Sequence, residues 1–255
     1  MKLLNIFHAE LRRFIPYPAF WVMMLVLIII TFGVFNMGTN FRINGIIVVD
    51  KTFPSLWHLG TYLVSCISFL PLIILINAVT NDIQYRVFKQ NVIDGFSRFQ
   101  WLVGKLFFIF FLSGLAVIIG AGIISFTGIQ STPWITPEMY FEKFYFVGLL
   151  FLHYVGWLSI GFLLILITKR SMLSLLSFFG LFLLEKYIVF KVEKLPVLLP
   201  FQVFNELVPR PKNELLDKMI PILPYTTYDL ILYACLYIPA CWGLSLLFIS
   251  YRDIR

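Results

Sequence analysis

Long apolar stretches limit what this chain can fold into. Six stretches of about 20 residues, each enough to cross a bilayer as a helix, are separated by shorter polar segments. Hydrophobic residues make up 60% of the 255 residues and charged residues only 13%, which lies outside the range of soluble domains. The sequence therefore predicts an all-α polytopic membrane protein, a single transmembrane domain with six transmembrane helices. The predicted spans cover residues 19–37, 57–80, 106–129, 144–168, 171–190 and 229–250.

Two other segments are predicted to lie at the membrane surfaces. Residues 1–16 place apolar side chains at helical spacing with most charged side chains on the other side. This pattern favours an amphipathic interfacial helix over a plain basic flank of the first span. Residues 191–228 contain six prolines among apolar and charged residues. Such a segment predicts short re-entrant helices in an outer region rather than another straight span.

Prolines and charges inside the predicted spans mark special positions. Pro71 and Pro239 lie within the second and sixth spans, where the missing N–H donor predicts a kink. Glu185 and Lys186 interrupt the outer end of the fifth span. We expect these two side chains to extend to the outer headgroups; the alternative is that they face a cavity between subunits.

Basic residues predict the orientation of the chain. With both termini in the cytoplasm, the short cytoplasmic segments carry 11 Lys and Arg residues and the short outer loops carry 3, the other 6 lying in the long outer region. Short cytoplasmic loops are enriched in basic residues. We therefore predict that both termini are cytoplasmic. The net charge of +7 then reflects membrane topology, and no nucleic-acid partner is expected.

Catalytic and ligand-binding motifs are absent from the sequence. It contains no GxxxxGKS or GxxxxGKT phosphate loop, no Gly-x-Ser-x-Gly and no HExxH. The three cysteines and three histidines have no metal-ligand spacing. For His153, in the fourth span, proton sensing or cargo contact is the alternative to a packed, hydrogen-bonded histidine, which we favour. We predict that the chain itself is not an enzyme and holds no metal or cofactor.

The polar run at residues 81–105 lies between the second and third predicted spans. Gly95 is expected to end a short helix, and Ser97 can cap the next one. The sequence therefore predicts a cytoplasmic helix, a sharp turn and a second helix that continues into the third span. The first helix is indicated by apolar residues at helical spacing, namely Ile83, Val87, Phe88, Val92 and Ile93.

This run resembles the coupling region of ABC exporter permeases of the second type. In that family the segment reads approximately Glu-x-Glu-x-Gly-Thr, an apolar helix, Pro-x-Ser-Arg, and Gly-Lys at the start of a span. Asp82 matches the first acidic position. Ser97 and Arg98 match the Ser-Arg pair, and Gly104 and Lys105 match the closing pair.

Other positions depart from the family pattern. Gln84 stands in place of the second acid, Arg86 and Val87 in place of Gly-Thr, and Gly95 in place of the proline. The six-span plan, the amphipathic amino-terminal helix and the re-entrant region are also similar to this family. The resemblance therefore covers essentially the whole chain.

The resemblance implies that the chain is a permease subunit of an ABC transporter. It would lie in the plasma membrane of a bacterium, that is, the inner membrane. Two permease subunits, expected to be a homodimer, would each rest a coupling helix in a groove of one of two ABC ATPase subunits, which bind ATP and Mg²⁺. Arg98 would fix the turn or pair with the ATPase or a lipid phosphate, and Lys105 would sit at headgroup level; plain anchoring by positive charge is the alternative. The coupling residues would be Asp82, Gln84, Arg86, Phe88, Lys89, Gly95, Ser97, Arg98, Gly104 and Lys105.

The cargo and an alternative function follow from what the spans contain. Few ionisable residues lie deep within them, which favours a hydrophobic or amphiphilic cargo over an ion. The alternative to transport is a membrane scaffold or assembly subunit that docks a soluble partner at the same loop. An associated ATPase would distinguish the two functions.

Overall fold

The protein is helical. The computed structural model describes residues 10, 12, 15, 18–39, 42–43, 46–47, 52–85, 87–93, 95, 97–191, 199–210 and 226–251. Within these residues the exception is a short antiparallel pair of strands, β1 (Arg42–Ile43) and β2 (Ile46–Ile47). The helices are α2 (Pro18–Thr39), α3 (Ser55–Ser65), α4 (Phe69–Gln84), α5 (Val87–Ile93), α6 (Arg98–Ser131), α7 (Pro137–Phe141), α8 (Tyr145–Thr168), α9 (Ser171–Lys191), α10 (Pro200–Glu206) and α12 (Thr227–Tyr251).

Several helices are long and apolar enough to cross a membrane. Among the described residues, four helical stretches have the length and the composition of a membrane span. They lie within α6, α7–α8, α9 and α12. The pair α3 and α4, bent by 40°, would make a fifth span. Helix α2 coincides with the first predicted span and carries a shorter apolar stretch, Phe20–Val34. The protein is therefore a multi-pass, helical membrane protein with four or five candidate spans.

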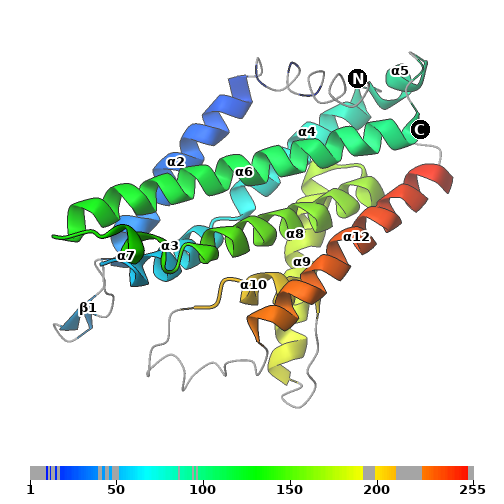
Figure 1. Cartoon of the computed structure of the whole chain (residues 1–255). Helices are drawn as coiled ribbons and strands as arrows, with labels where there is room; N and C mark the ends of the chain where they lie inside the picture. Colours follow the sequence, from blue (N-terminus) through cyan, green and yellow to red (C-terminus); the bar gives the residue numbers. More distant parts are fainter. Residues whose placement is uncertain are drawn as a thin grey trace.

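Helix α8 lies at the centre of the bundle. It contacts α3, α4, α6, α9, α10 and α12, and most of its side chains are buried, whereas most of those on α9 and α12 are not. Figure 1 shows α6 running along the length of the molecule beside α8. The start of α6, the loop with α5 and the end of α12 lie at one end, and α7 lies at the other.

The bend of 40° between α3 and α4 lies just before Pro71, for which the sequence predicts a kink. Residues 66–68 form a turn between the two helices. Proline has no N–H to donate to the carbonyl four residues earlier, which here belongs to Ile67. The chain forms a tighter hydrogen bond at this point, from Leu70 N to Ile67 O at 3.0 Å. By contrast, α12 continues through Pro239 without a break.

Helix α10 is the described part of the region predicted to be re-entrant, and residues 192–198 and 211–225 lie outside the described residues. Its first turn is bound by Glu185, whose carboxylate accepts the N–H groups of Phe201 and Gln202, both at 3.2 Å. The expectation that Glu185 extends to lipid headgroups is wrong, because its side chain is buried. The physical reason is that the first N–H groups of a helix have no partner within that helix.

A second helix also fixes α10. His153, on α8, has Nδ1 2.7 Å from the carbonyl oxygen of Phe204, so the prediction of a packed, hydrogen-bonded histidine is confirmed. The Phe204 ring lies directly over Gly156, where a Cβ atom would come within 2.2 Å of it. Glycine at this position therefore allows α10 to dock closely on α8.

Candidate functional site

The loop between α4 and α6 has the predicted helix, turn and helix. Helix α5 is followed by Gly95, whose φ of +89° is in the left-handed region that favours glycine. Arg98 then begins α6. The boundaries differ in one respect, because Asp82 and Gln84 belong to the end of α4 and not to the loop helix. We refer to residues 85–97 as the α5 loop.

Ser97 caps α6, as the sequence predicts. Its Oγ accepts the N–H of Gln100 at 3.1 Å, and Oε1 of Gln100 accepts the N–H of Ser97 at 2.8 Å. These two bonds form a capping box, which gives acceptors to two N–H groups that have none within the helix. The role of Gln100 in this capping box could have been predicted from the spacing Ser-x-x-Gln in the sequence. The cap fixes the direction in which the α5 loop joins α6.

Replacing Ser97 with alanine is expected to lower the free energy of unfolding by about 1 kcal/mol, because one N–H at the start of α6 loses its acceptor. Ser97→Asp is the matched control and should keep most of the stability, since aspartate is an equally good cap. Denaturant unfolding of the purified protein measures both variants. Equal losses in Ser97→Ala and Ser97→Asp would contradict a capping role.

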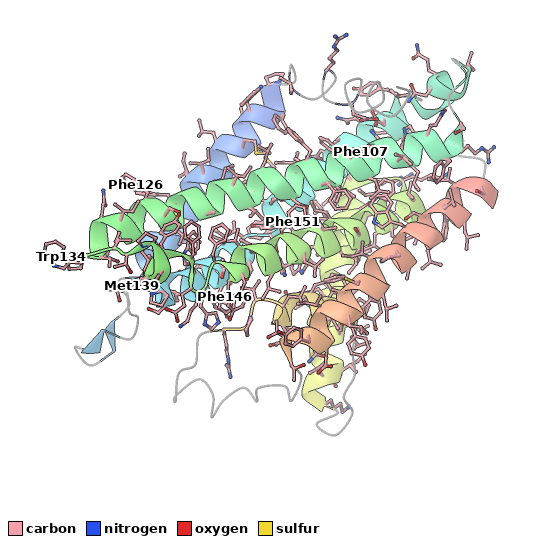
Figure 2. The ribbon with its side chains drawn as sticks, in the orientation of Figure 1. Phe107, Phe126, Trp134, Met139, Phe146 and Phe151 are labelled. Carbon is pink, nitrogen blue, oxygen red and sulfur yellow. The ribbon has the colours of Figure 1, made fainter. Side chains whose placement is uncertain are left out.

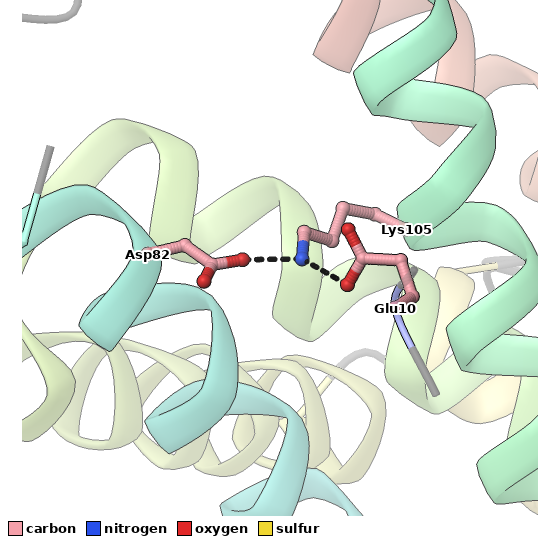
Figure 3. A network of polar contacts seen from close by, with 3 residues as sticks. All are labelled: Glu10, Asp82 and Lys105. Carbon is pink, nitrogen blue, oxygen red and sulfur yellow. Dashed lines mark hydrogen bonds and ion pairs between the residues drawn. The ribbon is translucent and has the colours of Figure 1, made fainter. Parts of the chain in front are cut away.

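A buried charge cluster lies beneath the α5 loop. Nζ of Lys105 is 2.7 Å from Oε2 of Glu10 and also forms an ion pair with the carboxylate of Asp82 (Figure 3). The ammonium lies 5.5 Å from the centre of the Trp101 ring. Lys105 is 0% exposed, and both carboxylates are buried. We call Glu10, Asp82 and Lys105 the charge triad.

The charge triad defines the surroundings of Lys105. This residue was expected at the level of the lipid headgroups, and its side chain is enclosed by protein. A buried ammonium requires a compensating charge, which Asp82 and Glu10 supply. Neither partner could be assigned from local spacing, because they lie 23 and 95 residues away. The pairing of Asp82 with Lys105 joins the two helices that flank the α5 loop.

Glu10 links a third segment to this site. Of the predicted interfacial helix at residues 1–16, the structure describes residues 10, 12 and 15, so the helix as a whole lies outside the described residues. Through Lys105, the segment before α2 is tied to α4 and α6. Sequence reasoning placed Glu10 on the polar side of a surface helix and missed this role.

Arg98 connects the α5 loop to the last helix. Its Nη1 donates to the carbonyl oxygens of Ile249 at 3.0 Å and Ser250 at 2.9 Å. These carbonyls belong to the final turn of α12, where the last four carbonyls of a helix lack partners within it. Of the roles expected for Arg98, fixing the turn agrees with these contacts.

The remaining predicted coupling residues are spread over the loop and its flanks. Gln84 is exposed at the end of α4, and Gly104 is buried in α6. Phe88 and Lys89 lie in α5, and Arg86 is outside the described residues. The structure therefore brings Asp82 and Lys105 into contact, and the other coupling residues that it describes lie on α4, α5, α6 and the loop between them.

Two exposed apolar side chains flank α5. Tyr85, before the helix, is 77% exposed, and Ile93, its last residue, is 84% exposed. Both side chains are therefore accessible from outside the chain. Within the described residues, no group of three His, Cys, Asp or Glu side chains is placed to hold a metal ion.

Comparison with known proteins adds no assignment. No family model and no curated protein matches the sequence.

Proposed function

We propose that this chain is the membrane subunit of an ATP-driven ABC exporter. It would have six spans, with α2 as the first, and both termini in the cytoplasm of a bacterial cell. Two copies would pair in the plasma membrane, each docking its α5 loop on a separate ABC ATPase. ATP and Mg²⁺ would bind in the ATPases, and the cargo would be hydrophobic or amphiphilic.

This proposal rests on two features of the α5 loop: exposed apolar side chains on the loop, and a buried ion pair between the two helices that flank it. Tyr85 and Ile93 offer apolar contacts to a soluble partner, and such side chains supply much of the binding energy of protein interfaces. Lys105, on α6, pairs with Asp82 at the end of α4, so it joins the two helices that flank the loop inside the protein. On this proposal, a displacement of the loop would be transmitted to these helices of the bundle.

A partner that contacts this loop should bind through Tyr85 and Ile93. Truncating each to alanine is expected to cost about 1.4 kcal/mol of binding, about tenfold in affinity. The measurement is the amount of ATPase that co-purifies with the full chain and its rate of ATP hydrolysis. Trp134→Ala is the matched control, since Trp134 is an aromatic side chain with 86% exposure at the opposite end of α6 (Figure 2).

The same experiment separates transport from the alternative function. Recovery of an ATPase with wild-type and Trp134→Ala protein, and its loss with Tyr85→Ala or Ile93→Ala, supports the exporter. Co-purification of a partner without nucleotide-binding activity would replace the exporter with a membrane scaffold. An ATPase that binds all variants equally would place its contact away from the α5 loop.

A further inference from the structure

Two of the polar contacts described next to the α5 loop, both made by side chains at the start of α6, lead in different directions. Lys105 connects the loop base to α4 and to Glu10. Arg98, at the first position of α6, connects the turn after Gly95 to the last turn of α12. The two residues are seven positions apart on α6, so both connections start from its first two turns. The roles expected for Arg98 from the sequence did not include a contact with α12.

The chemistry at the end of α12 suits a guanidinium group. The last carbonyls of a helix carry the negative end of the helix dipole, and a charged donor strengthens the hydrogen bonds to them. Ile249 and Ser250 both accept from the same nitrogen of Arg98. Part of this contact is exposed, so its contribution to overall stability is small. Its consequence is positional, because it fixes one end of α12 relative to the α5 loop.

The contacts that α12 makes farther from this end determine which other helices would be displaced with it. Trp242 donates from Nε1 to Oγ of Ser159 at 3.1 Å and stacks on Phe162 with ring centres 5.3 Å apart. Both partners belong to α8. Nearer its start, α12 contacts α10. A shift of α12 therefore reaches α8 at its middle and α10 at its other end.

We propose that Arg98 is a positioning residue that makes the α5 loop and the carboxyl end of α12 move as one body. This inference rests on the proposed function, in which a partner ATPase displaces the α5 loop. The displacement would then reach α12 through Arg98 and reach α4 and the amino-terminal segment through Lys105. Loss of Arg98 would remove the first route and leave the second intact.

The connection can be measured in the full chain without any partner. Spin labels at Gln90→Cys on α5 and Leu247→Cys on α12, both exposed positions, report the distance between the two elements once Cys66, Cys235 and Cys241 are replaced by alanine. A single narrow distance distribution is expected with Arg98. Arg98→Ala should at least double the width of this distribution. Arg98→Lys should keep the distribution nearly as narrow as it is with Arg98, since an ammonium also donates to carbonyls. An unchanged width in Arg98→Ala would overturn the proposal.

A second measurement uses the ATPase that co-purifies with the chain. Labels at Leu247→Cys and at Tyr145→Cys, an exposed position at the start of α8, should show an ATP-dependent change in distance. The change should persist in Arg98→Lys and be lost in Arg98→Ala, although both bind the same amount of ATPase. An ATP-dependent change that persists in Arg98→Ala would overturn the proposal. Absence of a co-purifying ATPase would overturn the proposed function, while the partner-free measurement would still decide whether Arg98 holds α12.

Discussion

Replacing Lys105 with methionine is expected to lower the free energy of unfolding by about 3–5 kcal/mol. Methionine preserves the length of the side chain but removes the cation between Glu10 and Asp82, both of which are buried. Two buried carboxylates then lie close together without the ammonium that compensates their charge. Denaturant unfolding of the purified protein in detergent micelles, followed by circular dichroism, measures the loss. This is the largest effect that we expect from one substitution.

Two further variants test whether the loss comes from charge. Lys191→Met is the matched control and should change stability by less than about 0.5 kcal/mol, since Lys191 is exposed on α9. The triple variant Glu10→Gln, Asp82→Asn and Lys105→Met should recover much of the stability, because the charge triad then carries no charge. If Lys105→Met were as stable as Lys191→Met, the charge triad would not form in the folded protein.

Replacing Gly156 with alanine is expected to destabilise the protein by about 1–3 kcal/mol. The new Cβ atom would lie 2.2 Å from the Phe204 ring, which is fully buried and cannot move without displacing α10. The displacement would also stretch the contact between His153 and the Phe204 carbonyl. The same unfolding measurement applies.

The control for this variant is on the same helix. Gly148→Ala should leave stability unchanged or raise it slightly, because no atom lies within 4 Å of the new Cβ and alanine favours a helix over glycine. Combining Gly156→Ala with Phe204→Leu should recover part of the loss, since the two residues are in contact. Equal stability of the Gly148→Ala and Gly156→Ala variants would show that α10 is not packed against α8 at this point.

The sequence predicts the local parts of this structure well, for a physical reason. Apolar stretches of sufficient length form helices regardless of their neighbours, so α8 and α9 begin and end within one residue of the predicted spans. Turn and cap residues also act locally. Gly95 and Ser97 therefore have the predicted conformation and hydrogen bonds.

Contacts between distant segments could not be derived in the same way. Arg98 reaches carbonyls 151 and 152 residues away, and Glu185 caps a helix that begins after seven residues outside the described structure. In each case the local sequence indicates a charge near a membrane surface and does not identify its partner. Partner choice depends on how the helices pack, and helix packing is set by many side chains together.

The pairing of Glu10 with Lys105 constrains the order of events during synthesis. The ribosome makes Glu10 long before Lys105, which follows 95 residues later. Until then the carboxylate has no ammonium to meet, and burying it alone would be costly. We therefore expect Glu10 to remain hydrated while the first helices form, and to reach its buried position only after α6 has emerged.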